Sequence, residues 1–105
     1  MEQFDVIWNK LTASLRPGTE IKHWNPYNGY LGEGLTIISC SSESISINPP
    51  RVWETQDIPK KDFKQVWDVW PDYLALRLDR RKIHGLTDHS KYIISIFHWY
   101  ETGRC

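Results

Sequence analysis

Apolar residues in the first part of the chain recur at the spacing of an α-helix. They fall on one face of a helix with about 3.6 residues per turn, which predicts that this face packs on a core. Pro17 and Gly18 then end the helix, because proline cannot continue it and glycine relaxes the turn. The apolar face consists of Phe4, Ile7, Trp8, Leu11 and Leu15.

The middle of the chain has the pattern of strands and turns. Residues 20–24 are a candidate for a short extended segment, and residues 35–40 are rich in strand formers. Residues 44–48 alternate polar and apolar side chains, so one face is buried. The short spacing between the last two strands predicts an antiparallel hairpin. Residues 25–34 contain three glycines and predict a loop, and residues 52–55 are expected to form an edge strand.

Helical spacing returns after residue 58, with Phe63, Val66, Trp67 and Trp70 on one face. Pro71 is expected to interrupt this helix and to begin a short helix over residues 72–76. A further short helix is predicted over residues 80–84, with Asp79 as its N-cap and Gly85 as its C-terminal stop.

Residues 90–100 fit two patterns. Their β-branched and aromatic content favours a strand. Their apolar residues also form a helical stripe, and Thr87 and Asp88 supply capping oxygens ahead of it. We predict a helix and leave the strand as the alternative.

These elements predict a single α+β domain over residues 1–105. It has an N-terminal helix, an antiparallel meander of three or four strands, and a C-terminal helical layer packed on the sheet. The predicted core consists of Phe4, Ile7, Trp8, Leu11, Ile37, Ile45, Ile47, Phe63, Val66, Trp67, Trp70, Ile93, Ile96 and Phe97.

Composition excludes several classes of protein. Thirteen basic and thirteen acidic residues cancel, and no apolar run is long enough to span a bilayer. The N-terminus lacks the features of an export signal, so we expect a cytoplasmic protein with no membrane partner. Cys40 and Cys105 form no Cys-x-x-Cys motif, and the four histidines show no metal-ligand spacing, so we predict no metal and no cofactor.

No motif of a known catalytic class is present. The glycines of residues 25–34 lack the lysine and hydroxyl ending of a phosphate loop, and no serine lies in a Gly-x-Ser-x-Gly elbow. We therefore assign no catalytic residues and favour a protein that is not an enzyme.

The aromatic content is unusual, with six Trp, five Tyr and three Phe in 105 residues. A domain of this size has difficulty burying so many rings, each with about 150–250 Å² of surface. Some rings are therefore expected to line a pocket or a subunit interface, the alternative being an aromatic-rich core. The candidates are Trp24, Tyr27, Tyr30, Trp53 and Trp99.

Charge is distributed unevenly along the chain. Residues 1–59 hold four basic and seven acidic side chains, whereas residues 60–91 hold eight basic and five acidic ones. Basic side chains on short helices can contact phosphates, although a solvated, neutralised face is the alternative. The candidate nucleic-acid or anion contacts are Arg77, Arg80, Arg81, Lys82 and Lys91.

The second half of the chain also resembles a known group of proteins. Together with residues 44–48, the segments Ile58-Pro59-Lys60-Lys61-Asp62-Phe63, Trp70-Pro71-Asp72-Tyr73 and His89-Ser90-Lys91-Tyr92 resemble small uncharacterised proteins encoded by mobile integron gene cassettes. This resemblance implies a soluble bacterial protein that often self-associates and has no assigned activity. Residues 58–96 are also similar to helical modules that accompany restriction-type nucleases, which would imply DNA contact near residues 77–91.

Three functions follow, in order of preference. The first is a non-enzymatic binding or interaction protein that self-associates, by default as a dimer, through its surplus aromatic rings. The second is a nucleic-acid-binding module that uses residues 77–91. The third is a small-molecule binder whose pocket is walled by aromatic side chains.

Overall fold

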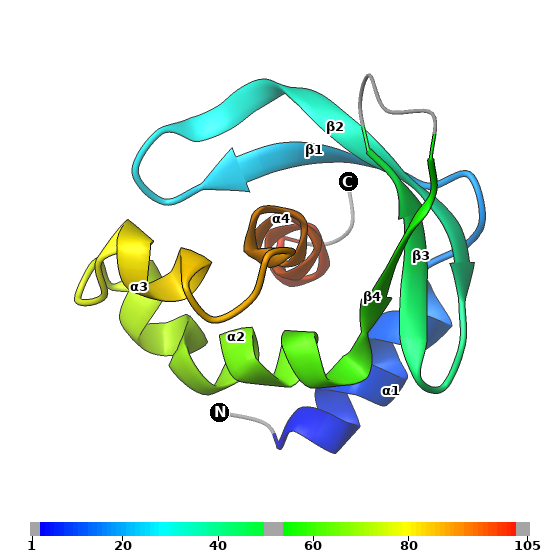
Figure 1. Cartoon of the computed structure of the whole chain (residues 1–105), viewed down its shortest axis with the longest axis horizontal. Helices are drawn as coiled ribbons and strands as arrows, with labels where there is room; N and C mark the ends of the chain where they lie inside the picture. The colour runs from blue at the N-terminus through cyan, green and yellow to red at the C-terminus, as the bar shows by residue number, and fades with distance from the viewer. Residues whose placement is uncertain (1–2, 50–53, 103–105) are drawn as a thin grey trace.

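The computed structural model describes residues 3–49 and 54–102 of the chain. It has an α+β fold in which one curved antiparallel sheet, of strand order β1-β2-β3-β4, packs against helices (Figure 1). Helix α4 lies at the centre, with the sheet curving over one side of it and α1 and α2 on the other. The elements are α1 (Phe4–Ser14), β1 (Glu20–Asn25), β2 (Gly29–Cys40), β3 (Ser44–Asn48), β4 (Gln56–Pro59), α2 (Lys60–Leu74), α3 (Arg80–His84) and α4 (Ser90–Glu101).

The predicted hairpin forms between β2 and β3. Ile37 lies opposite Ile47 and Cys40 lies opposite Ile45, in antiparallel register. The register shifts between Ile37 and Ser39, because Ile38 is an extra residue on β2. Such a bulge bends and twists its strand, in keeping with the curvature of the sheet around α4.

The prediction of a loop over residues 25–34 was wrong for most of that stretch. Strand β1 extends to Asn25, and β2 begins at Gly29. The side chain of Asn25 accepts hydrogen bonds from the backbone N–H groups of Tyr27 and Asn28, which closes a tight turn. Gly29 and Gly32 have φ values of 71° and 85°. These glycines therefore serve a turn and an irregular strand, and not a long loop.

Two further boundaries differ from the predictions. Of the expected edge strand over residues 52–55, residues 52 and 53 lie outside the described residues and residues 54 and 55 are not in a strand; the fourth strand is β4, from Gln56 to Pro59. Pro71 does not interrupt the second helix, since α2 continues to Leu74. Trp70 and Tyr73, on either side of this proline, are both buried, so tertiary packing holds the last turn in helical form.

The other helices agree with their predictions. Asp79 caps α3, its side chain accepting a hydrogen bond from the N–H of Arg81. Residues 90–100 form a helix, so the alternative of a strand is wrong.

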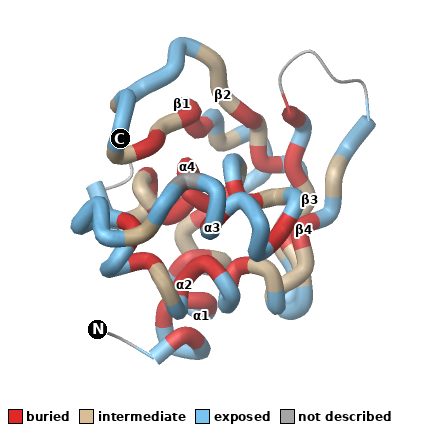
Figure 2. The backbone as a smooth tube through the Cα atoms, turned by 60° about the vertical axis from the view of Figure 1, so that its left-hand side comes forward, coloured by how far each residue is buried: buried red, intermediate tan, exposed pale blue. Residues whose placement is uncertain are grey.

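The core lies between the sheet, α4 and the pair α1 and α2. All of the core residues predicted above are buried, and Figure 2 shows the buried stretches of these elements around the interior. The ring of Phe97 on α4 is at its centre. Its centroid lies 5.8 Å from that of Phe63, 5.3 Å from that of Trp67 and 5.4 Å from that of Trp70. Rings at such distances and inclinations attract one another beyond the burial of their surface.

Helix α4 also lies against strand β1, at the end of the sheet. The backbone N–H of Trp24 donates a hydrogen bond of 3.1 Å to the hydroxyl of Ser95, which is 1 % exposed. The same hydroxyl donates to the carbonyl oxygen of Lys91, one turn earlier in the helix. Ser95 thus satisfies a strand N–H that has no neighbouring strand to bind.

Replacing Ser95 with alanine is expected to lower the free energy of unfolding by about 1–3 kcal/mol, because it leaves the partly buried N–H of Trp24 without an acceptor. Chemical denaturation measures this loss. Ser14→Ala is the matched control, since the Ser14 hydroxyl also bonds the carbonyl four residues earlier but at an exposed site. Equal losses for the two variants would contradict the role given to Ser95.

Candidate functional site

A pocket of about 710 Å³ lies between the β1–β2 hairpin and the second half of α4. Its wall combines apolar side chains with hydroxyl, imidazole, carboxyl and ammonium groups. The described residues that line it are Glu20, Ile21, Lys22, Tyr30, Gly32, Glu33, Gly34, Leu35, Thr36, Ser95, His98 and Trp99.

Three rings are held together at one side of this pocket. Trp24 and Tyr30 are cross-strand partners in the hairpin, so their side chains lie on the same face of the sheet. The imidazole of His98 stacks on Trp24, with ring centroids 3.7 Å apart and planes inclined by 3°. Its Nε2 atom is hydrogen-bonded to the hydroxyl of Tyr30 at 3.2 Å. These contacts fix His98 and Tyr30 in place before any ligand is bound.

Burial favours the neutral form of the His98 imidazole. Removal from water lowers the pKa of its imidazole below the ordinary value of 6.5. At neutral pH the ring is therefore neutral, and it brings polar atoms to the pocket without adding positive charge.

The backbone of β2 also shapes the wall of the pocket. The register between β1 and β2 shifts between Lys22 and Trp24, where Gly32 adopts its positive φ. Gly34 lies so close to β1 that a Cβ atom there would be 2.4 Å from the carbonyl oxygen of Ile21. A side chain at this position would push the two strands apart, so the close approach that forms this wall requires glycine.

A buried histidine lies on β1 close to the pocket residue Glu33. His23 is 1 % exposed, its ring is tilted against that of Tyr92 at 5.8 Å, and its Nε2 atom has no hydrogen-bond partner. Burial lowers its pKa, Lys91 lowers it further, and Glu33 opposes both effects. The folded protein therefore favours the neutral form of His23.

The structure brings three of the five candidate aromatic residues together. Tyr30 and Trp99 line the pocket, and Trp24 stacks on His98 beside them. Tyr27 lies apart, its hydroxyl donating to the carbonyl oxygen of Leu78. Trp53 lies outside the described residues.

Sequence reasoning missed the residue that joins these rings, His98. The sequence carried a partial signal, because Trp24 and Tyr30 are equally spaced about a turn that begins with Asn25-Pro26. A hairpin read from this turn would have paired the two rings. Nothing in the sequence placed the end of α4 beside them.

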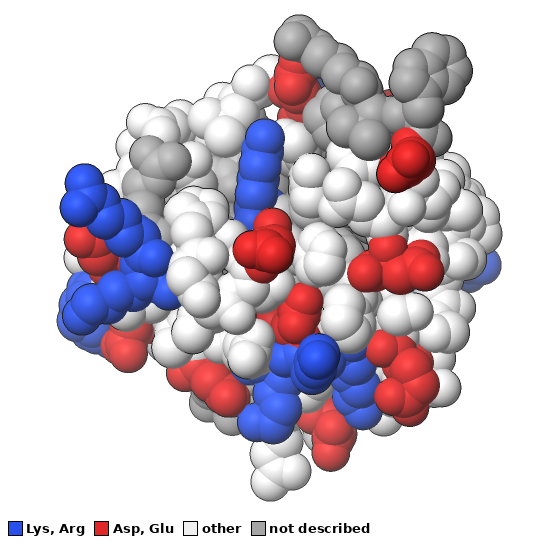
Figure 3. All heavy atoms as spheres, viewed as in Figure 1, with Lys and Arg blue, Asp and Glu red and all other residues white. Residues whose placement is uncertain are grey.

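The candidate phosphate contacts do not form one uniform basic patch. Figure 3 shows Lys and Arg side chains gathered around α3 with Asp side chains between them. Arg77 forms an ion pair of 2.9 Å with Asp72. Arg81 and Lys82 are exposed on α3, whereas the side chain of Arg80 lies outside the described part of the structure. Lys91 lies on α4, where its charge acts on His23.

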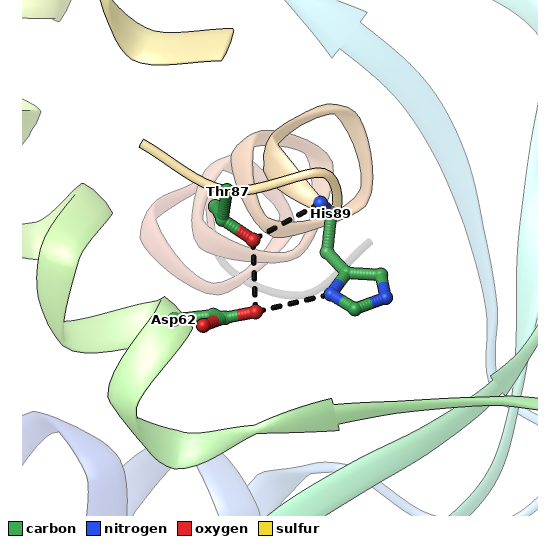
Figure 4. A network of polar contacts seen from close by, with 3 residues as sticks. All are labelled: Asp62, Thr87 and His89. Atoms are coloured by element: carbon green, nitrogen blue, oxygen red, sulfur yellow. Dashed lines mark hydrogen bonds and ion pairs between the residues drawn. The ribbon is translucent and has the colours of Figure 1, made fainter. Parts of the chain in front are cut away.

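A second polar cluster joins α2 to the start of α4 (Figure 4). The Asp62 carboxylate accepts a hydrogen bond of 2.8 Å from the hydroxyl of Thr87 and lies 3.1 Å from Nδ1 of His89. The Thr87 hydroxyl in turn accepts a hydrogen bond from the backbone N–H of His89. Thr87 and His89 lie in the connection between α3 and α4, so their contacts with Asp62 fasten that connection to α2.

The described residues include no group of three His, Cys, Asp or Glu side chains that could hold a metal ion. Among the helices of residues 3–49 and 54–102, none is both long and apolar enough to cross a membrane.

The pocket is thus the feature of this structure best suited to binding chemistry, because it joins a concave wall to fixed rings and polar groups. Comparison of the chain with protein-family models, with curated proteins and with solved structures finds no match.

Proposed function

We propose that the protein binds a small organic molecule in the pocket between the β1–β2 hairpin and α4. The observation that supports this proposal is the pocket itself, whose volume of about 710 Å³ lies in the range typical of ligand sites. Ligand sites combine apolar and aromatic walls with a few placed polar groups, and here Trp99 and Leu35 accompany Tyr30 and His98. The proposed role is the binding of this molecule.

The packing of the aromatic rings favours a pocket over self-association. Of the fourteen rings, eight are buried within the chain and three are half-buried, whereas only Tyr27 and Tyr30 are exposed among the described residues. The described part of the chain therefore leaves few rings for a subunit interface. Self-association and nucleic-acid binding stay predictions, which sedimentation and a salt-dependent DNA titration respectively would test.

Filling the pocket is expected to abolish ligand binding. Thr36 lines the pocket and is half-buried, so Thr36→Trp places an indole in the space that a ligand needs. The measurement is a thermal-shift screen with a set of aromatic and heteroaromatic fragments, since a ligand in excess raises the melting temperature. Fragments that stabilise the wild type are expected to leave the Thr36→Trp melting temperature unchanged.

Ile38→Trp is the matched control. Ile38 lies on the same strand, at the bulge, is 41 % exposed, and does not line the pocket. This variant is expected to respond to the same fragments as the wild type. Fragments that stabilise Thr36→Trp as much as the wild type, or a screen without hits, would refute the proposed function.

A further inference from the structure

The pocket is lined by more negatively charged side chains than positively charged ones. Among the described residues that line it, Glu20 and Glu33 carry carboxylates and Lys22 carries an ammonium group. His98 adds no positive charge at neutral pH, because burial lowers its pKa. The pocket is thus negative on balance, although the whole chain has a formal net charge of zero.

The same pocket has an exposed aromatic ring in its lining, that of Tyr30. Tyr30 is 60 % exposed, the largest exposed fraction of any large hydrophobic side chain among the described residues. Its hydroxyl is held by His98, which fixes the ring at the edge of the pocket. Trp99 also lines the pocket, but at 9 % exposed its indole presents little surface there. The faces of tyrosine and tryptophan rings attract cations through their quadrupole.

We infer that the ligand of this pocket is a small organic cation of the alkylammonium class. This inference rests on the proposed function and names the class of molecule that the pocket selects. Aromatic faces and a negative lining act in the same direction, since both stabilise a positive charge and neither favours an anion. Ile21 and Leu35 also line the pocket, but at 2 % and 1 % exposed they offer a bound ligand little apolar surface.

The charged residues then have opposite roles in selection. Glu20, on β1, and Glu33, on β2, attract the cation from the two strands of the hairpin. Lys22, two residues after Glu20, repels it and weakens binding. Removing a carboxylate and removing the ammonium group are therefore expected to change affinity in opposite directions, which a purely apolar pocket would not show.

The test compares choline with its uncharged isostere, in which carbon replaces the quaternary nitrogen, by isothermal titration calorimetry on the full chain. The two probes have nearly the same shape, so their difference reports the charge. Choline is expected to bind about tenfold more tightly than the isostere, which corresponds to about 1.4 kcal/mol. Choline is also expected to lose its affinity in the Thr36→Trp variant.

Variants of the lining residues test the origin of this preference. Glu20→Gln and Glu33→Gln are each expected to weaken choline binding by about two- to fivefold, the range for an ion pair near the surface, and to leave isostere binding unchanged. Lys22→Gln is expected to strengthen choline binding by a similar factor. Glu43→Gln is the matched control, because Glu43 lies in the turn before β3 and does not line the pocket.

The outcomes separate this inference from the proposed function. If the isostere binds as tightly as choline and both are lost in Thr36→Trp, the pocket binds ligands and the inference of a cation is wrong. If neither probe binds while aromatic fragments do, the inference of a cation is again wrong, and the proposed function of ligand binding in the pocket is retained. If Glu20→Gln and Glu43→Gln have equal effects on choline, the carboxylates of the lining do not select charge and the inference fails.

Discussion

Replacing Trp67 with alanine is expected to lower the free energy of unfolding by about 3–5 kcal/mol, the usual loss for a large aromatic side chain in a core. Trp67 is 5 % exposed, and its ring lies edge-on to that of Phe97 at a centroid distance of 5.3 Å. The substitution removes this contact and leaves a cavity between α2 and α4. Because a domain of this size has about 5–15 kcal/mol of stability, the loss is a large fraction of the whole.

Urea denaturation followed by circular dichroism measures this effect as a shift of the midpoint. Val6→Ala is the control, since Val6 lies on α1 and is 44 % exposed. Its expected change is within about 0.5 kcal/mol. A loss below about 1 kcal/mol for Trp67→Ala would mean that this ring is not part of the core that stabilises the fold.

Acidification is expected to destabilise the protein at a pH above the range in which carboxylates titrate. Burial holds the pKa of His23 below its ordinary value of 6.5 in the folded state. Above about pH 6.5 the ring is neutral in both states and contributes nothing. Below it, the unfolded chain takes up a proton first, so the free energy of unfolding falls by up to about 1.4 kcal/mol per pH unit and per proton. The fall ends at the folded pKa, and the lowered pKa of His98 acts in the same direction.

Denaturation at several pH values between about 8 and 5 measures this slope, a window that lies above the ordinary pKa values of Asp and Glu. His23→Leu is expected to reduce the slope by the contribution of one proton, because leucine is neutral in both states. Glu33 and Lys91 act on His23 and remain in this variant. At the alkaline end of the range the two proteins are expected to have parallel profiles. An unchanged slope in His23→Leu would contradict the assignment.

The helices and the core could be predicted because the buried face of a helix makes apolar residues recur at a regular spacing in the sequence. The stripe from Phe4 to Leu11 and the stripe from Phe63 to Trp70 each correspond to a helix with that face buried. The wrong predictions concern glycine and proline, because each of these residue types occurs both at the ends of helices and strands and within them. Glycine in residues 29–34 forms an irregular strand, and Pro71 lies within α2 because its neighbours Trp70 and Tyr73 are fixed in the core.

The pocket was predictable only in part. Aromatic content pointed to Trp24, Tyr30 and Trp99, but a sequence does not show which rings share a site. Their meeting depends on the register shift between Lys22 and Trp24 and on the docking of α4 against β1. Both are long-range features, separated by about seventy residues in the case of Trp24 and Ser95. No local period encodes such a contact.

The bond between Ser95 and Trp24 has a consequence for how the chain avoids aggregation. Strand β1 is at the end of the sheet, and an uncovered end strand offers its free backbone groups to any other extended chain. Helix α4 masks this side of β1, yet it follows every strand in the sequence. During synthesis the sheet can therefore form before α4 covers β1. A chain that ends before α4 leaves the backbone groups of β1 unpaired, and another extended chain can pair with them and start misassembly.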